Sequence, residues 1–176
     1  MKARNMALCA QFAALLAVCA WIAIPVGDTV FTMQTFGVFL ALGLLGGKRG
    51  TAAIFVYLAL GAVGLPVFTG FRGGIGALVG ITGGYLSGFL LSGLVYWLVT
   101  GLWGGSGKVR LLAMVAGLLV CYAFGCLWYR FGYVENGKPL GIVMIFVKCV
   151  LPYLLPDGCK LALAFYLTGR LKRFIK

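Results

Sequence analysis

The sequence predicts an all-α integral membrane protein, and its composition carries that prediction. Of the 176 residues, 62% are hydrophobic and only 10% are charged, whereas about one quarter of the residues in a soluble domain are charged. The chain also holds 28 glycines, and glycine is commoner in transmembrane helices than in soluble ones. The apolar runs leave no stretch long enough for a soluble domain, so we expect one membrane domain over residues 1–176.

Six apolar runs predict six transmembrane helices, because a hydrocarbon core about 30 Å thick needs about 20 apolar residues in a helix. The runs lie at about 6–25, 31–47, 50–66, 76–101, 109–129 and within 140–171. The first three end at the helix-breaking residues Pro25, Gly46 and Pro66. No small-residue cleavage site follows the first run, so we expect a retained helix there and not a signal peptide.

The last run is about 32 residues long and too long for one straight span. Pro156 suits the first position of a helix, where its missing N–H has no partner to lose. We therefore expect a short outer piece at about 140–151, then a turn, then a helix from about 156 to 171. This places Asp157 in the first turn of that helix, in the outer third of the membrane.

The distribution of basic residues predicts the orientation. With six spans both termini share one side of the membrane. That side carries Lys2, Arg4, Lys48, Arg49, Lys108, Arg110, Arg170, Lys172, Arg173 and Lys176. The opposite loops hold only Arg72, Arg130 and Lys138. Lys and Arg accumulate in cytoplasmic loops, so we expect both termini in the cytoplasm and the protein in the cell membrane.

Several function classes are excluded or disfavoured. The net charge of +12 follows from bases at the ends of apolar runs, so we expect no nucleic-acid partner. The chain has no His, and its six cysteines form no CxxC pair, so we expect no metal site. The stretch GLLGGKRG at 43–50 lacks the glycine spacing and the Ser/Thr of a P-loop. Paired carboxylates and a placed nucleophile are missing too, so we do not expect an enzyme.

Asp157 and Lys160 stand out because they lie within an apolar run, and the chain holds only three acidic residues. An ionisable group inside a membrane costs at least about 3 kcal/mol and indicates a functional site. Residues three apart share one helix face. At the start of a broken helix the pair would form a polar ligand site with free backbone N–H groups. A purely structural ion pair remains the alternative.

Small residues form two further patterns. Ala3, Ala7, Ala10, Ala14 and Ala17 recur at steps of four and three, which favours close helix–helix approach, either to a partner or inside the protein's own bundle. In the fourth run, GITGGYLSGF at 80–89 is polar and rich in glycine, so it can unwind. Gly83, Gly84 and Tyr85 would then line the cavity of Asp157, although Tyr85 also suits an interfacial aromatic belt.

Residues 30–89 resemble the BioY family, the biotin-binding S components of energy-coupling-factor (ECF) transporters. The resemblance covers nearly the whole chain and rests on MQT, GKRG, GLPVF, GGIGALVGITGGYLSGF and the closing LPDGCK. It implies the six-helix ECF S-component fold, high-affinity biotin uptake without a cofactor, and work with a membrane coupling subunit (the T component) and two cytoplasmic ATPases. An S component for thiamine or riboflavin is the alternative. Ile81 replaces the family's usual proline, which puts the backbone bend there in doubt.

The resemblance also implies roles for single residues. Asp157 would accept hydrogen bonds from the ureido N–H groups of biotin, and Lys160 would meet the ureido carbonyl or the valerate carboxylate. Arg72 is a rival partner for that carboxylate. The remaining candidates for the pocket are Gln34, Thr35 and Tyr85, with the loop at 26–33 as part of a lid. Ala7, Ala10 and Ala14 would dock on the coupling subunit.

Overall fold

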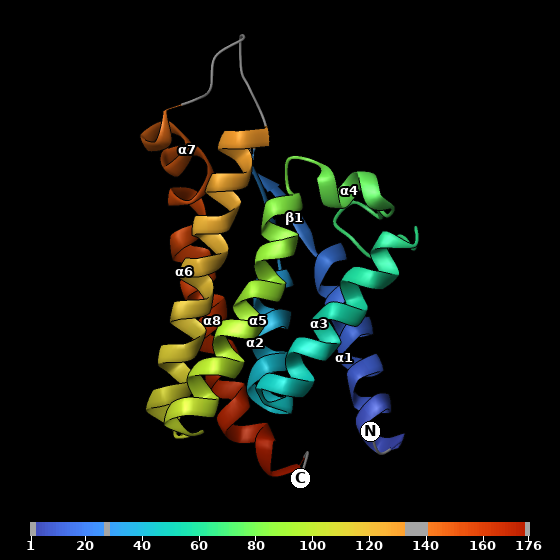
Figure 1. Ribbon diagram of the computed structural model, residues 1–176, viewed down its shortest axis with the longest axis vertical. Coiled ribbons are helices and arrows are strands. Elements are labelled where there is room, and N and C mark those ends of the chain that lie inside the picture. Colours follow the sequence, from blue (N-terminus) through green and yellow to red (C-terminus); the bar gives the residue numbers. More distant parts are fainter. Residues whose placement is uncertain (1–2, 27–28, 133–140, 175–176) are drawn as a thin grey trace.

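The computed structural model describes residues 3–26, 29–132 and 141–174 and is a bundle of helices with a small hairpin at one end (Figure 1). The helices are α1 (Ala3–Trp21), α2 (Gln34–Leu45), α3 (Gly47–Ala62), α4 (Ile75–Val79), α5 (Gly83–Trp103), α6 (Gly107–Gly132), α7 (Ile142–Cys149), α8 (Leu151–Leu171) and the 3-10 helix η1 (Lys172–Phe174). The strands are β1 (Ala23–Val26) and β2 (Thr29–Thr32). The all-helical fold class is thus confirmed.

Helix α2 is the centre of the bundle. Eleven of its twelve residues are buried, all but Phe36, and it packs against α1, α3, α5 and α8. A helix that is apolar on every side is expected inside a protein or in lipid, and here the other helices supply the cover. Gly43 permits the close contact with α8, because a Cβ at this position would overlap the side chain of Thr168.

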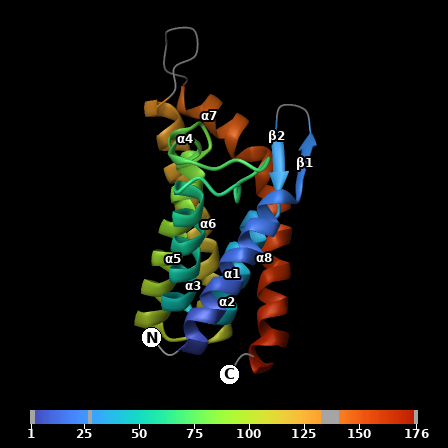
Figure 2. The ribbon, with the colours of Figure 1, turned by 90° about the vertical axis from the view of Figure 1, so that its right-hand side faces the viewer.

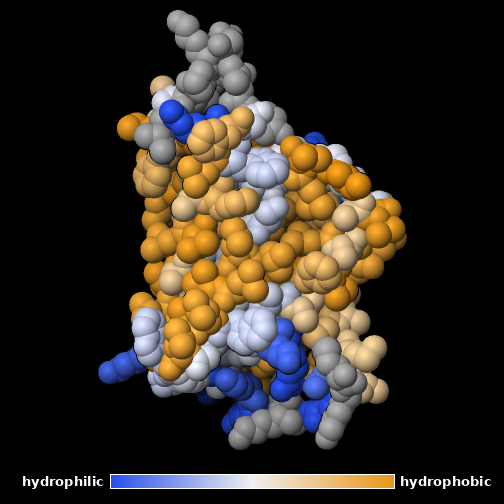
Figure 3. Space-filling view, viewed as in Figure 1, coloured by the Kyte–Doolittle hydropathy of each residue, from blue (hydrophilic) through white to orange (hydrophobic). Residues whose placement is uncertain are grey.

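The surface has an apolar middle and hydrophilic ends. Both termini lie at one end of the bundle (Figures 1 and 2), as the basic residues predicted for a chain with an even number of spans. Hydrophilic side chains gather at that end, and apolar side chains cover most of the visible face between the ends (Figure 3). This pattern fits a molecule whose sides face hydrocarbon and whose ends face water.

The prediction of six spans is not confirmed by helix length. Within the described residues, three helices, α1, α5 and α6, are long and apolar enough to cross a membrane, and α7 with α8 forms a fourth span if the bent pair counts as one. Helix α2 has 12 residues and α3 has 16, or about 18 and 24 Å of helix. Each is shorter than a hydrocarbon core of about 30 Å.

Two helix starts differ from the sequence prediction. The run expected at 31–47 begins as a helix only at Gln34, because Thr29–Thr32 pairs with Ala23–Val26 in an antiparallel hairpin. β-Branched residues dominate these strands, which favours extended backbone. The run expected at 76–101 is divided by a turn at 80–82 into α4 and α5. The backbone therefore bends at Ile81, and the Trp128 indole N–H donates to the Gly80 carbonyl at 3.2 Å.

The predicted helix start at Pro156 is wrong. Helix α8 begins at Leu151 with Pro152 in its first turn, and Pro156 lies inside the helix. The break falls at Val150, where the axis bends by 47° between α7 and α8. Either proline could stand in the first turn of a helix, but only one of them can be in the first turn of α8. Asp157 consequently lies in the second turn of α8, beyond the unpaired N–H groups of the helix terminus.

Candidate ligand-binding site

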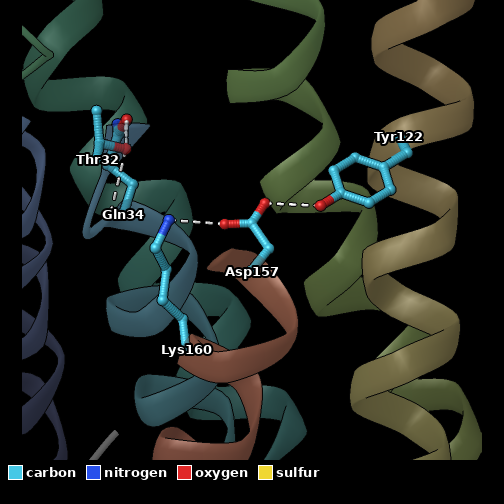
Figure 4. A network of polar contacts seen from close by, with 5 residues as sticks. All are labelled: Thr32, Gln34, Tyr122, Asp157 and Lys160. Carbon is cyan, nitrogen blue, oxygen red and sulfur yellow. Dashed lines mark hydrogen bonds and ion pairs between the residues drawn. The ribbon is translucent and has the colours of Figure 1, made fainter. Parts of the chain in front are cut away.

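Asp157 is the centre of a buried polar cluster (Figure 4). Asp157 is buried, with only 4% of its surface exposed. The ammonium of Lys160 donates to Oδ1 at 2.8 Å, and the hydroxyl of Tyr122 in α6 donates to Oδ2 at 2.7 Å. The predicted placement of Asp157 and Lys160 on one face of a helix is therefore confirmed, and α6 adds a third member.

Tyr122 is the residue that sequence reasoning missed. It lies between Cys121 and Phe124 in the apolar run at 109–129, which the sequence marks only as a membrane helix. The available signal was a tyrosine well inside an apolar run, away from the interfaces where tyrosine is usually enriched. Its buried hydroxyl needs a partner, and a carboxylate on a neighbouring helix provides one. The cluster therefore ties α6 to α8.

Desolvation makes this cluster costly as a purely structural element. A buried ion pair often fails to recover the free energy of removing both charges from water, and the side chains of Lys160 and Asp157 are only 12% and 6% exposed. Among the described residues each carboxylate oxygen accepts one side-chain hydrogen bond, and it has the lone pairs for another. Asp157 thus keeps acceptor capacity for a ligand with N–H donors.

Gln34 belongs to a second polar cluster, at the start of α2. Its amide nitrogen donates to the Tyr57 hydroxyl at 2.8 Å. Its amide oxygen accepts from the hydroxyls of Thr32 at 3.0 Å and Thr69 at 3.1 Å. Gln34 therefore joins the hairpin, α3 and the 63–74 loop. Thr35 is buried beside it at 7% exposure.

The two clusters belong to helices that pack against one another, since Gln34 begins α2 and Asp157 lies in α8. In Figure 4 the Lys160 ammonium extends from α8 toward the side on which Thr32 and Gln34 lie. Gln34 has hydrogen-bond partners of its own, which give it a structural role, and its membership of the same site as Asp157 and Lys160 stays a prediction.

Tyr85 points elsewhere. Its hydroxyl donates to the Cys149 carbonyl at 3.0 Å, next to the bend between α7 and α8. Its ring lies so close to Gly125 in α6 that a Cβ there would stand 2.5 Å from it. These contacts give Tyr85 a bracing role between α5, α6 and α7. A direct role in ligand binding stays a prediction.

Gly83 and Gly84 are buried in the first turn of α5. A Cβ at Gly83 would overlap the backbone carbonyl of Leu78, and a Cβ at Gly84 would overlap the Trp128 side chain. Because neither glycine has a side chain, the chain can turn into α5 and α5 can contact α6 closely. The expected break in the stretch 80–89 lies at 80–82, and both glycines come after it in the helix.

Arg72 lies on the exposed 63–74 loop. The loop is closed by a hydrogen bond from the Phe68 N–H to the Arg72 carbonyl at 2.9 Å, and it carries Thr69, which reaches Gln34. The guanidinium of Arg72 is therefore attached to a segment that touches the polar region, while the side chain itself is on the outside. A role with a ligand carboxylate remains a prediction.

Aromatic contacts close the hairpin end of the bundle. Trp21 stacks on Phe71 with ring centroids 5.2 Å apart, and its indole N–H donates to the Pro66 carbonyl at 2.9 Å. Phe31 in β2 packs against Tyr153 in α8 with centroids 5.1 Å apart. The predicted lid at 26–33 includes residues 27–28, which lie outside the described residues, but its β2 part does cover the start of α8.

The alanine stripe faces outward over most of its length. Ala7, Ala10 and Ala14 are exposed, whereas Ala17 is buried. Packing inside the protein's own bundle therefore does not explain the first three.

Two surface hollows among the described residues lie away from Asp157, one along α6 and one between α3 and α5. Within the described ranges no group of three His, Cys, Asp or Glu side chains could hold a metal ion.

The comparison with known proteins decides the family. The family model of the BioY family matches residues 1–176. The chain belongs to the BioY family. A Pyrococcus horikoshii protein named "Probable biotin transporter BioY" is 40% identical over 172 residues, which cover 98% of each chain. The Thermotoga maritima "Biotin transporter BioY" is 41% identical over 162 residues, which cover 92% of each.

A solved structure supports the same assignment. It is described as the S-component for biotin from an ECF-type ABC transporter, determined at 2.1 Å. It matches this BioY chain with a TM-score of 0.83 and 26% identity, covering 98% of this chain and 92% of the other. This chain therefore has the S-component fold and is a multi-pass membrane protein. Because BioY proteins are transporters, the expectation that the chain is not an enzyme is confirmed.

Proposed function

We propose that this protein captures biotin from outside the cell and carries it across the cytoplasmic membrane as the substrate-specific component of an ATP-driven ECF transporter. Both termini would be cytoplasmic, and the end with Asp157 would face outward. The observation that carries the proposal is the buried Asp157 carboxylate with spare acceptor capacity, held by Tyr122 and Lys160, in a chain whose relatives are named biotin transporters.

The chemistry of biotin suits this cluster. Its ureido group has two N–H donors and one carbonyl acceptor, and its ring system and tail are largely apolar. Asp157 would accept from the N–H groups, and Lys160 would donate to the ureido carbonyl or to the valerate carboxylate. Arg72, at the hairpin end, is the second candidate for that carboxylate. The binding step needs no cofactor or metal ion.

Entry of the ligand would require the hairpin end to open. In the closed arrangement Asp157 is buried, and the contacts of Phe31 with Tyr153 and of Trp21 with Phe71 hold the covering segments down. Separating these aromatic pairs would expose the polar region from the hairpin side. The hydrogen bonds of the ligand would then offset the desolvation of the cluster.

A binding screen tests the substrate. Isothermal titration calorimetry of the purified protein in detergent should give strong binding of biotin and none of thiamine or riboflavin. The Cys159→Ser variant is a matched control, since Cys159 lies on α8 between Asp157 and Lys160 in sequence but is exposed. Binding of thiamine or riboflavin in place of biotin would overturn the assignment while leaving the S-component role intact.

The energising partners would be a membrane coupling subunit and two cytoplasmic ATPases. The exposed face formed by Ala7, Ala10 and Ala14 suits close helix–helix packing in a membrane, so it would dock on the coupling subunit. Ala14→Trp should abolish co-purification with that subunit and leave biotin binding intact. Leu119→Trp is the control, because Leu119 is 60% exposed and lies on α6 and not on the helix that carries the stripe. An intact complex with Ala14→Trp would disprove the docking face.

A further inference from the structure

Helix α1 carries an exposed line of residues at heptad spacing. Arg4, Gln11 and Val18 recur every seven residues, and Ala7 and Ala14 follow three residues after the first two of them. All five are exposed. In two helices that coil around one another, the residues at these two heptad positions form the contact line. We call these five residues the α1 seam.

The opposite face of α1 packs into the bundle. Cys9, Ala13, Leu16 and Ala20 are buried there, and the helix contacts α2 and α3. The α1 seam therefore points away from the neighbouring helices. Within the part of the chain that the structure describes, no segment covers it.

Gln11 is the polar residue in the middle of this seam. Helix α1 is apolar enough to cross a membrane, and Gln11 lies eight residues after its first residue and ten before its last. Eight residues correspond to about 12 Å of helix. The side chain is therefore at the level of the hydrocarbon, where no water is available. Its amide brings two N–H donors and one carbonyl acceptor to that level.

The Gln11 amide has no hydrogen-bond partner among the described residues. Gln34 provides the contrast, because its amide nitrogen donates to Tyr57 and its oxygen accepts from two threonines. Acyl chains offer neither donors nor acceptors, so an unpaired amide in hydrocarbon is costly. Glutamine side chains in membranes commonly hydrogen-bond across to another helix. Gln11 therefore calls for a partner helix outside this chain.

The charge at one end of the seam disfavours a second copy of this chain as that helix. Arg4 lies two turns from Gln11 on the same face. Two copies have the same orientation in the membrane, so pairing along the seam would place their two Arg4 guanidinium groups side by side. Like charges brought together across an interface are costly. A helix of a different protein avoids this repulsion.

We propose that the α1 seam packs lengthwise against one transmembrane helix of the coupling subunit and that Gln11 hydrogen-bonds to a polar side chain of that helix. The inference rests on the docking role proposed above and adds the chemistry of the partner. The small side chains of Ala7 and Ala14 let the two backbones approach closely, and heptad spacing gives a crossing angle of about 20°. A polar residue at one seam position fixes the register of paired helices, so Gln11 determines the depth at which the helices dock.

Binding of the purified protein to the coupling subunit with its two ATPases tests Gln11. Energy transfer between fluorescent labels in lipid nanodiscs gives the dissociation constant. Gln11→Leu keeps much of the side-chain bulk and removes its hydrogen bonds, so we expect binding to weaken by about three- to tenfold. Gln11→Asn keeps an amide and should lose less. Ser87→Ala is the control, because it removes a partly exposed hydroxyl from α5 and should leave binding unchanged. Unchanged biotin calorimetry shows that the three variants fold.

The outcomes distinguish this inference from the proposed function. If Ala14→Trp abolishes the complex while Gln11→Leu binds as tightly as the wild type, the docking face stands and the hydrogen bond of Gln11 is disproved. If the complex survives Ala14→Trp as well, the docking face fails and the inference fails with it. Energy transfer between two labelled copies of this chain that is lost in Gln11→Leu would assign the α1 seam to a second copy and overturn the proposal.

Discussion

The two polar clusters of the bundle differ in how completely their hydrogen bonds are satisfied. At Gln34, the amide oxygen accepts two hydroxyl donors and the amide nitrogen donates to Tyr57, so neutral groups hold one another in place. At Asp157, a full charge is buried with one donor on each oxygen. A neutral, saturated cluster stabilises a fold at little cost, whereas a charged cluster with spare acceptors suits a ligand. This difference distinguishes the Gln34 cluster, which stabilises the fold, from the Asp157 cluster, which can bind a ligand.

The largest expected effect is on affinity, in Asp157→Asn. The amide keeps the shape of the side chain but loses the charge that pairs with Lys160 and one of the two acceptor oxygens. Losing a hydrogen bond to a charged group costs about 1.5–3 kcal/mol, which weakens biotin binding by roughly ten- to a hundredfold. Calorimetry of folded protein in detergent measures it, with Lys160→Ala expected to act in the same direction. Unchanged affinity in both variants would reject this site.

The Gln34 cluster should respond in the opposite way. Gln34→Leu leaves the buried Tyr57 hydroxyl and two threonine hydroxyls without their partner, so the free energy of unfolding should fall by about 1–3 kcal/mol. Biotin affinity should change much less than in Asp157→Asn. Thermal unfolding in detergent and calorimetry measure the two quantities separately. A loss of affinity equal to that of Asp157→Asn would make Gln34 a ligand contact and erase the distinction between the clusters.

Tyr122→Phe tests whether α6 orients the carboxylate. The change removes one donor from Asp157 and keeps the aromatic packing. We expect biotin affinity to fall by about three- to tenfold, equivalent to one hydrogen bond of about 1 kcal/mol. Tyr85→Phe is the control, because its hydroxyl contacts Cys149 and not the carboxylate. If Tyr85→Phe weakened binding more than Tyr122→Phe, the bracing role of Tyr85 would be wrong.

The smallest effect is expected for Thr69→Val. Gln34 would lose one of its two hydroxyl donors and keep Thr32, so the free energy of unfolding should fall by about 0.5–1.5 kcal/mol. Unfolding in detergent again measures it. A destabilisation as large as that of Gln34→Leu would show that the 63–74 loop, and not the amide as a whole, holds this cluster together.

Several features were readable from the chain alone because they depend on local spacing. The apolar runs predicted membrane helices, the three-residue spacing placed Asp157 and Lys160 on one helix face, and the distribution of bases predicted both termini at one end. The steps of four and three likewise put Ala7, Ala10 and Ala14 together. Run length, loop charge and helical periodicity are local properties of the chain, so these features do not depend on packing.

Other features were decided by packing between distant segments. The start of α8 at Leu151 instead of Pro156 depends on which of two prolines occupies the first turn, and both are locally acceptable. The strands at Ala23–Val26 and Thr29–Thr32 need one another to pair. The short α2 is covered by four neighbouring helices, and among the described residues fewer than six helices are long and apolar enough to cross a membrane.

The membership of the site divides in the same way. The sequence by itself determined that a carboxylate and an ammonium share one face of the last helix, since that follows from 3.6 residues per turn. Only the tertiary structure decided that Tyr122 from α6 completes the cluster, that Gln34 joins a network of its own, and that Tyr85 turns toward Cys149. Those partners come from other elements of the fold, and hydrogen bonds across packed helices depend on the positions of whole helices and not on spacing within one.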